Sequence, residues 1–392
     1  MNHYPHQHNP LDRRSFFKTS LLGGVALALP WSARRVLAAA TQPATEPATG
    51  PGSTLGRTSR VALTAGEDRA DLAFQALRPF SQQIAAAIGD KRVILKPNNV
   101  VIDRPLAASD AKNLEGILEF LKSIGKAGKV VIAESPAGGS VFEGFANYGY
   151  DKVAAKYGAK LMDLDKDDFE TLYCFDEKDF RPHACRMAKT LLDPNRFVIS
   201  AAKFKTHDRV VATLSLKNIV VGAAIKRSGG ERPEGGRWGS SDKPVTHGSG
   251  YRGINYNLFS LASRLHPHLA VIDGYEGMEG NGPASGTPVA SRVAIASRDF
   301  IAADRVGVEC MGVEPKWVGY LRYCGQVGLG NYDMAKIDIR GPQIASVQKK
   351  YQLASDVERQ LAWMTPLDVE DGSWIGPKGR RTDRRPPAAP AK

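Results

Sequence analysis

Short apolar runs and amphipathic stretches alternate along the middle of the chain, and this alternation predicts the fold. Apolar runs bounded by turn residues indicate buried strands, and they occur at residues 60–63, 93–95, 130–133, 161–164, 197–199, 269–272 and 293–296. Helical spacing between them predicts helices at 71–87 with an interruption at Pro79, and at 110–124, 150–157, 255–265 and 299–311. Strand and helix in repeated order predict an α/β fold, with a mainly parallel sheet flanked by helices on both faces.

Three stretches depart from this alternation. Residues 165–195 are more polar and predict an excursion before the central strand. Residues 226–253 form a long loop rich in Gly and Ser, which we interpret either as a lid over a binding site or as a disordered loop, with His247 as a solvated residue in it. An amphipathic helix at about 344–361 is expected as a C-terminal extension, followed by a basic, proline-rich end that is expected to be disordered.

Polar residues stand just past the ends of several predicted strands. Lys96, Glu134, Lys205 and Asp273 each occupy such a position. In open parallel sheets, ligands bind beyond the carboxyl ends of the strands. These residues are therefore expected to meet at one rim, where ammonium groups face carboxylates.

The densest group of polar residues lies in the stretch 197–222. After Val210 and Val211, residues at alternate positions would share one face of an extended segment. Lys217 has apolar neighbours on both sides, so its ammonium is expected to be partly buried and to need a carboxylate or a bound anion. The polar residues of the group are Lys205, His207, Thr213, Ser215, Lys217 and Asn218.

A glycine-rich stretch follows the strand predicted at 269–272. Its backbone could present several N–H groups to an anion, or it could be a tight connector that holds Asp273 and Glu279 in place. The stretch matches neither a P-loop nor a dinucleotide-binding fingerprint. Its glycines are Gly274, Gly277, Gly280, Gly282 and Gly286.

Several short motifs occur together and in a fixed order. They are Lys96-Pro97-Asn98, VIAE at 131–134, KFKTH at 203–207, TLSLKN at 213–218, IDG at 272–274 and MEGNGP at 278–283, followed by Asp299 and Asp304. Over residues 60–342 this set resembles the DUF362 family, a bacterial and archaeal group named for its unknown function. The resemblance implies one domain and no particular reaction. The family is compared by architecture with the nickel-dependent lactate racemase group, which is an analogy of fold alone.

The cysteines provide no metal or redox motif. The chain has four of them, at 174, 185, 310 and 324, without a C-x-x-C pair. Some members of the resembling family carry a ferredoxin-like cassette with closely spaced cysteines, and this chain has no such iron–sulfur cassette. Cys174 and Cys185 could form a disulfide in an oxidising compartment.

Two chemical accounts of the rim remain open. In the first, a divalent metal is held by Glu134, Asp273 and Glu279, with His207 as a further ligand, and lysines bind a carboxylate or phosphate of the substrate. In the second there is no metal, and neighbouring cations lower the pKa of one lysine until it acts as a base or forms an imine. The predicted catalytic residues are Lys205, His207 and Lys217, and the predicted substrate-binding residues are Lys96, Asn98, Asn218, Gly280 and Gly282.

The positive charge is concentrated at the two ends of the chain. The 392 residues carry a net charge of +12, of which the first 40 residues hold +4 and the tail from Pro377 holds +5. A body with a net charge of +3 gives little support to nucleic-acid binding. The hydrophobic content of 42% is ordinary for a globular protein with a sizeable core.

The N-terminus resembles a twin-arginine export signal. Arg13 and Arg14 precede an apolar run at 21–31, which is short for a bilayer span, and small residues at 38–40. The predicted organisation is a signal peptide at 1–40, a disordered linker at 41–59, a DUF362-like domain at 60–342, and a C-terminal helix with a basic tail at 343–392. Export by the twin-arginine (Tat) translocase would place the protein in the periplasm without a stable membrane span after cleavage; an N-terminal membrane anchor is the alternative.

These observations predict an exported enzyme that acts on a small carboxylate or phosphate compound at the strand ends. The alternative is a non-catalytic periplasmic binding protein, or an accessory protein for redox or cofactor assembly. An enclosed polar pocket whose ionisable residues have perturbed pKa values favours the enzyme. A shallow anion site beside an exposed apolar patch favours the alternative.

Overall fold

The computed structural model describes residues 57–365, 374–375 and 381–382. These residues belong to the compact unit Thr49–Lys392. The predicted signal peptide, most of the predicted linker and most of the basic end lie outside the described residues. Within the part that is described, none of the helices combines the length and the apolarity needed to cross a membrane.

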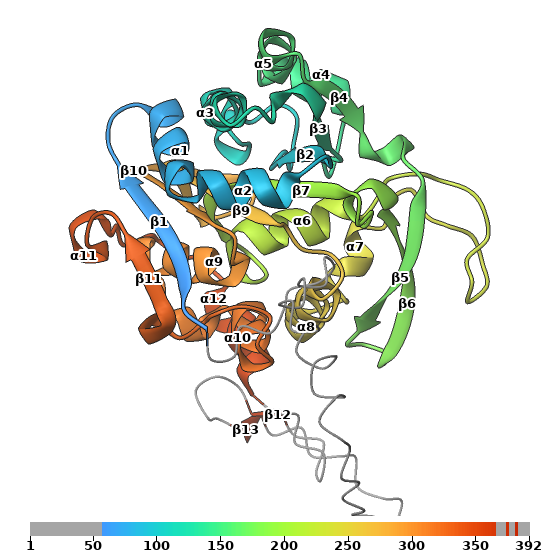
Figure 1. The fold of residues 1–392 in the computed structure, drawn as a ribbon. Helices are drawn as coiled ribbons and strands as arrows, with labels where there is room; N and C mark the ends of the chain where they lie inside the picture. Colours follow the sequence, from blue (N-terminus) through green and yellow to red (C-terminus); the bar gives the residue numbers. More distant parts are fainter. Residues whose placement is uncertain (1–56, 366–373, 376–380, 383–392) are drawn as a thin grey trace, which may run out of the picture. The chain divides into compact units, whose positions relative to one another are not determined.

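A nine-stranded sheet forms the centre of the described unit (Figure 1). Its order is β11-β1-β10-β9-β7-β2-β3-β4, with β8 paired to β7. Strands β9, β7, β2, β3 and β4 run parallel to one another, and β1 is parallel to β11. Strand β10 is antiparallel to both β9 and β1, and β8 is antiparallel to β7, so the predicted mainly parallel sheet is confirmed. The bounds are β1 Ser59–Ala65, β2 Arg92–Pro97, β3 Val130–Glu134, β4 Lys160–Asp163, β7 Arg196–His207, β8 Val211–Thr213, β9 Leu269–Asn281, β10 Ser285–Ser297 and β11 Ile337–Arg340.

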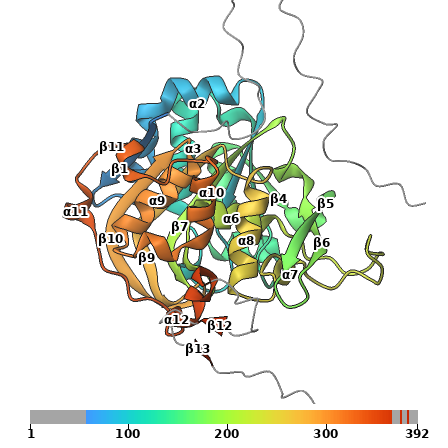
Figure 2. The ribbon, with the colours of Figure 1, turned by 90° about the horizontal axis from the view of Figure 1, so that it is seen from below.

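Helices cover both faces of the sheet, as predicted (Figures 1 and 2). One core, which includes Val93 and Ile199, packs with residues of α1, α2, α3 and α5. The opposite core, which includes Ile94 and Val198, packs with residues of α6, α8, α9 and α10. The helices are α1 Arg69–Leu77, α2 Ser81–Ile88, α3 Ala111–Ser123, α4 Val141–Asn147, α5 Tyr150–Tyr157, α6 Ser215–Ala223, α7 Lys243–Thr246, α8 Tyr251–Ala262, α9 Phe300–Cys310, α10 Gly319–Gln326, α11 Ile344–Val347 and α12 Val357–Gln360.

Aspartates and a proline set several helix boundaries. Asp68 and Asp110 accept hydrogen bonds from backbone N–H groups at the starts of α1 and α3, and Asp299 does so at the start of α9. The predicted interruption at Pro79 is a 3-10 turn, Arg78–Phe80, between α1 and α2. These signals are short-range, which explains why the sequence predicts these helices well.

The centre of the chain differs from the prediction in two respects. Strand β7 runs from Arg196 to His207, so the polar residues beyond residue 199 belong to the strand and not to a loop. The extended segment predicted to align Thr213, Ser215 and Lys217 is wrong, because β8 ends at Thr213 and helix α6 begins at Ser215. Lys217 and Asn218 therefore reach the sheet from a helix that packs on it.

The glycine-rich stretch is an antiparallel ribbon made by the ends of β9 and β10, in which Gly280 pairs with Gly286. The Gly280 N–H donates to the carbonyl of Gln352 at 2.8 Å, and the Gly282 N–H donates to the Gly280 carbonyl at 2.9 Å. These donors are already satisfied within the chain. The predicted anion-binding nest at Gly280 and Gly282 is therefore wrong, and the alternative, a connector, describes the stretch better.

The predicted helix at 344–361 is also wrong. Only α11 and α12 are helical, and the residues between them are not. In the segment between α11 and α12, the Gln352 N–H donates to Glu279 Oε2 at 2.8 Å, and the Gln352 carbonyl accepts from the Gly280 N–H. Contacts with the ribbon satisfy the backbone here, so a distant tertiary partner overrides the local helical pattern.

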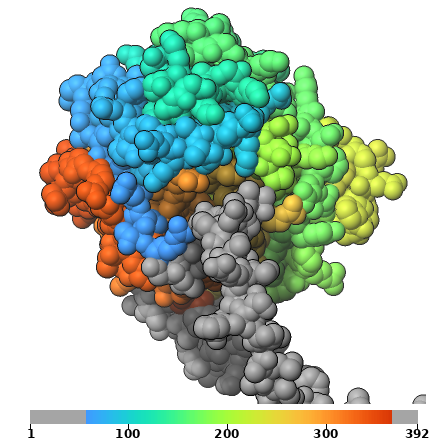
Figure 3. Space-filling view, viewed as in Figure 1, coloured from blue at the N-terminus to red at the C-terminus, as the bar shows by residue number. Residues whose placement is uncertain are grey.

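The excursion predicted at 165–195 contains a hairpin of β5 Phe169–Asp176 and β6 Arg181–Ala188. Part of the loop at 226–242 packs against this hairpin, and Figure 3 shows the yellow loop beside the green hairpin at the edge of the surface. Buried Trp238 lies over the guanidinium of Arg186 at 4.4 Å and contacts Phe169 edge to face. Arg186 also pairs with buried Asp242 at 2.9 Å. These anchors hold the loop against the hairpin, and none of residues 226–242 lines the cavity described below.

Candidate functional site

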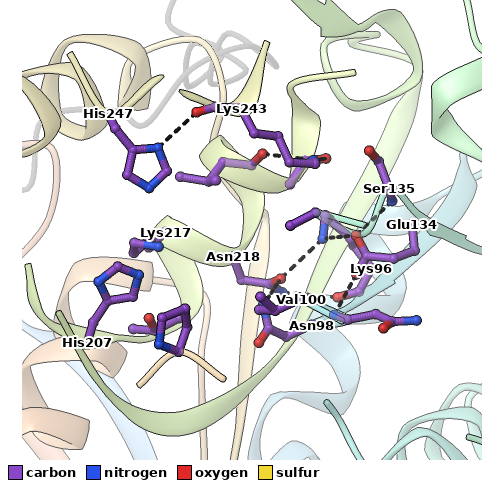
Figure 4. Close-up of a pocket in the computed structure, with 16 residues that line it drawn as sticks. Lys96, Asn98, Val100, Glu134, Ser135, His207, Lys217, Asn218, Lys243 and His247 are labelled. Carbon is purple, nitrogen blue, oxygen red and sulfur yellow. Dashed lines mark hydrogen bonds and ion pairs between the residues drawn. The ribbon is translucent and has the colours of Figure 1, made fainter. Parts of the chain in front are cut away.

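A cavity of about 140 Å³ lies where the carboxyl ends of the central strands meet helix α6 (Figure 4). Lys96 and Glu134 come from the ends of β2 and β3, His207 from the end of β7, and Lys217 from the first turn of α6. This volume is below the range of about 300–1,000 Å³ that is usual for pockets of drug-sized ligands, so a bound ligand would be small. Residues far apart in the sequence thus line one partly open cavity at the predicted rim.

Lys96 and Glu134 form a buried ion pair in the wall of the cavity. Lys96 Nζ donates to Glu134 Oε1 at 2.8 Å and to Asn218 Oδ1 at 3.1 Å. Glu134 also accepts hydrogen bonds from the backbone N–H groups of Asn99 at 2.9 Å and Ser135 at 2.8 Å. These additional partners offset the cost of removing both charges from water.

Two asparagines connect this pair to a second buried lysine. Asn98 donates to Asn218 Oδ1 at 3.1 Å, and Asn218 donates to the hydroxyl of Ser200 on β7 at 3.0 Å. Lys205 donates to Asn98 Oδ1 and to the Ala107 carbonyl. Burial, reinforced by nearby lysines, holds the pKa of Lys205 well below its usual value. Lys205 does not line the cavity; it supports Asn98 from behind.

Lys217 is held in place by its helix, and its Nζ has no hydrogen-bond partner in the part of the chain that the structure describes. Asp304 of α9 accepts hydrogen bonds from the backbone N–H groups of Ser215 and Leu216 at 2.7 and 3.0 Å, which fixes the first turn of α6. Among the described residues, no acceptor lies within hydrogen-bonding distance of Lys217 Nζ, and only the more distant charge of Asp208 favours its protonated form. Burial lowers the pKa of Lys217 to about 8.

Two histidines flank Lys217 and are held in opposite tautomers (Figure 4). His207 Nδ1 accepts the backbone N–H of Arg209 at 2.9 Å, so the ring proton sits on Nε2. His247 Nδ1 lies 2.8 Å from the Lys243 carbonyl, to which it must donate, so its Nε2 carries a lone pair. Burial holds the pKa of His207 well below its usual value and lowers that of His247 to about 4. Both rings are therefore neutral near pH 7, one offering a donor and the other an acceptor.

Lys243 supplies a further ammonium group at the other end of α6. Its Nζ donates to the carbonyls of Ala224 at 2.7 Å and Val221 at 3.2 Å, which satisfies the end of the helix. Burial lowers the pKa of Lys243 to about 7. The prediction that His247 is a solvated loop residue is wrong. The short helix α7 places Lys243 and His247 against the cavity.

Two more side chains of the cavity wall carry polar atoms without a partner. Both the amide nitrogen and the amide oxygen of Asn99 are buried and form no hydrogen bond, and the same holds for the hydroxyl of Thr213. Buried polar groups nearly always have a partner. These two residues are therefore well suited to contact a ligand.

Asp273 lies outside this site, contrary to the prediction that it shares the rim. It stands opposite Lys203 in the pairing of β7 with β9 and lies 3.6 Å from Arg69 Nε. Burial raises the pKa of Asp273, while Lys203 and Arg69 oppose that shift. Arg69 also pairs with Asp110 at the start of α3, so this second charged cluster belongs to the sheet face covered by α1 and α3.

The predicted metal ligands do not form a set that fits a divalent cation. Glu134 is the one carboxylate among the described residues that line the cavity, and its oxygens are engaged by Lys96 and two backbone N–H groups. Glu279 binds the backbone of Gln352, and Asp273 belongs to the other cluster. In the described part of the chain, no group of three or more His, Cys, Asp and Glu residues is arranged to hold a metal ion. A divalent cation needs several oxygen or nitrogen donors, so the donor set here does not fit one.

The comparison with protein families agrees with the motifs of the site. A family model described as "Domain of unknown function (DUF362)" matches residues 93–309, which is more than half of the chain. The chain belongs to the DUF362 family. All the cavity-lining residues named above, from Lys96 to His247, fall inside the matched DUF362 region.

One curated relative of this DUF362 chain is the thylakoid-associated protein sll1697 of Synechocystis sp.. The two are 24% identical over 240 residues, which is 61% of this chain and 68% of the relative. No solved structure matches the chain. The comparisons therefore establish the family and leave the chemistry to the geometry of the DUF362 site.

Sequence reasoning missed part of this DUF362 site. Lys243 and His247 lie in a stretch read as a loop, and no local signal links them to the strand ends. Nothing in the sequence marks Asn99, which follows the Lys96-Pro97-Asn98 motif, as a ligand contact, and Thr213 is one polar residue among several in the stretch 197–222. The one signal in the sequence was the coincidence of Lys243 and His247 at i and i+4, which a short helix places on one face.

Proposed function

We propose that this protein is a metal-independent enzyme whose cavity binds a small carboxylate or phosphate compound. The single observation that carries the proposal is Lys217, a buried amine that has no hydrogen-bond acceptor among the described residues. Glu134, the one carboxylate among the described residues that line the cavity, is already paired with Lys96. A buried cation without a counter-ion is costly. An anionic ligand would supply the missing charge.

The balance of charges around the cavity supports an anion as the ligand. The lysines in or directly behind its wall are Lys96, Lys205, Lys217 and Lys243, against the single carboxylate Glu134. Burial lowers the pKa of Lys217 to about 8 and that of Lys243 to about 7, and the carboxylates that oppose these shifts do not restore the usual value. An anion would favour the protonated forms of both amines.

The histidines support an enzyme over a simple binding protein. A binding site needs charge and shape, whereas His207 and His247 add a donor and an acceptor in fixed tautomers on either side of an amine. Such groups transfer or stabilise protons during a reaction. Perturbed pKa values gathered in one site also favour catalysis. A binding or accessory role remains the alternative, and it predicts ligand binding without turnover.

Calorimetric titration with propionate and with inorganic phosphate tests the proposal. We expect one of the two anions to bind stoichiometrically and the variant Lys217→Met to lose at least about tenfold in affinity, since a charge-assisted contact contributes about 1.5–3 kcal/mol. Lys152→Met, which removes an exposed lysine of α5, is the matched control and should bind as the wild type does. Absence of binding by both anions, or equal affinity of the two variants, would rule the proposal out.

We further propose that the protein is exported through the twin-arginine route into the periplasm. Arg13 and Arg14 before a short apolar run support this route. The name of the Synechocystis relative describes it as thylakoid-associated, which is in keeping with a protein that is transported to or across a membrane. Replacing both arginines by lysine should retain the protein in the cytoplasmic fraction; unchanged export would contradict the proposal.

A further inference from the structure

The position of Lys217 is that of a nucleophile and differs from the positions of the lysines that stabilise the fold. Lys96, Lys205 and Lys243 each donate to at least two acceptors of the chain, which hold their ammonium groups in place. Lys217 Nζ has no such acceptor among the described residues and lines the cavity. Its loss of a proton would therefore break no hydrogen bond of the fold.

The surroundings of Lys217 lower its pKa to about 8, so part of the amine is neutral near pH 7 in the empty site. The charged and titratable groups that act on it or that it acts on are Lys205 and His207 of β7, Asp208 just after that strand, and His247 after α7. Both histidines are neutral near pH 7, and Asp208 is the one opposing carboxylate in this group. A neutral lysine amine is the form that attacks carbonyl carbon.

We propose that Lys217 forms an imine with the carbonyl carbon of a small 2-oxo acid held in the cavity. This inference rests on the proposed function, because the carboxylate of such an acid is the anion that the site binds. Beside that carboxylate, a 2-oxo acid carries the carbonyl group that the amine of Lys217 attacks. A compound of the size of pyruvate or glyoxylate suits a cavity of about 140 Å³.

The chain supplies a group for each end of the ligand. Asn99 offers an unpartnered amide to the carboxylate, and Lys243 adds its charge to the cavity wall without a direct contact. His207 presents Nε2–H toward the carbonyl oxygen, where it stabilises the negative charge that develops as the bond forms. His247 lies on the other side of the amine and carries a lone pair on Nε2 (Figure 4).

The steps balance without a cofactor. Nζ of Lys217 attacks the carbonyl carbon, and the C=O electron pair moves to oxygen. His247 Nε2 takes one proton from the attached nitrogen and passes it to that oxygen, which gives a carbinolamine. The same nitrogen gives up its second proton through His247 as the C–O bond breaks, so both amine hydrogens leave in one water molecule. His247 begins and ends neutral, and no redox change occurs.

Reductive trapping tests this proposal on the full-length chain. The protein is incubated with pyruvate and cyanoborohydride, which converts an imine irreversibly to a secondary amine, and the adduct is located by peptide mass mapping. We expect one adduct per chain, on Lys217, and slower labelling when propionate is added as a competitor without a carbonyl group. The variant Lys217→Arg, which keeps a positive charge, should still bind propionate and should lose the adduct.

The outcomes separate this inference from the proposed function. Binding of propionate without any pyruvate adduct would overturn the imine and leave the anion site standing. An adduct spread over exposed lysines such as Lys152, or retained in Lys217→Arg, would also overturn it. Failure of propionate and of phosphate to bind would refute the proposed function itself. The wild-type peptide map identifies the labelled lysine even if the variant is unstable.

Discussion

Lys96 Nζ lies 2.8 Å from Glu134 Oε1, and each of these side chains is only 1% exposed. The pair joins the carboxyl ends of β2 and β3, and each partner has further hydrogen bonds, to Asn218 for the lysine and to backbone N–H groups for the carboxylate. Its charges cancel inside the cavity wall. The pair therefore shapes the site while leaving the charge of Lys217 uncompensated.

The first prediction concerns the stability of this pair. Glu134→Gln leaves the Lys96 ammonium buried without a counter-ion, and breaking a buried pair in this way costs about 3–5 kcal/mol. We expect the free energy of unfolding measured with urea to fall by about that amount. The double variant Lys96→Met with Glu134→Gln should recover a substantial part of the loss. Additive losses in the double variant would show that the two side chains do not interact.

A second prediction concerns the close approach of α6 to β2. A Cβ added at Gly222 would overlap Cε and Nζ of Lys96. Gly222→Ala should therefore displace the ammonium from Glu134 and weaken propionate binding at least about tenfold, with the fold retained because only the end of a flexible side chain must move. Gly128→Ala is the control, since a Cβ there meets nothing within 4 Å. Equal propionate affinity in both variants would contradict the assignment.

A third prediction concerns the carboxylate that caps α6. Burial raises the pKa of Asp304 to about 7, whereas an unfolded aspartate titrates near 3.9. The folded state then binds more protons than the unfolded state between these values, so stability should decline as the pH rises from about 4 to 7. Asp304→Asn should be less stable by about 1–2 kcal/mol through loss of a cap, and should lack this part of the decline. Identical pH profiles would contradict the prediction.

The cysteines lead to a fourth prediction. All four are free and buried, and the Cys185 thiol has its pKa raised well above the usual value, first by a hydrogen bond with Cys174 and then by burial. Thiols of this kind are unreactive because they are not thiolates. A thiol reagent should therefore modify none of the four cysteines rapidly in the folded, reduced protein and all of them after denaturation. Rapid labelling of Cys185 before unfolding would refute this.

Much of the fold was predictable because its determinants are local. Apolar runs located the sheet strands, and the interruption at Pro79 and the helix ending at Gly158 appeared where expected. The failures occurred where a distant partner decides the local structure. Lys217 follows a strand-like pattern, yet it is helical because Asp304 caps the first turn of α6. Likewise, Gln352 bonds to the ribbon in place of its expected helix.

The site was predictable in part for the same reason. Strand ends in a parallel sheet meet at one edge, which brought Lys96, Glu134 and His207 together. Asp273 also follows a strand end, but its side chain belongs to the face of Arg69 and Lys203. The pairing of β7 with β9 has an irregularity between residues 203 and 205. Because such an irregularity changes the alternation of side chains, the sequence alone does not show which face of the sheet a side chain near it takes.

The pH dependence of propionate binding tests the central claim most directly. The pKa of Lys217 is lowered to about 8 in the empty site, and a bound anion raises it again, so binding above pH 8 takes up a proton. We predict that propionate affinity falls about tenfold for each pH unit above 8, and that Lys217→Met binds weakly without this fall. An affinity that stays constant or rises across this range in the wild type would contradict a site built around the Lys217 ammonium.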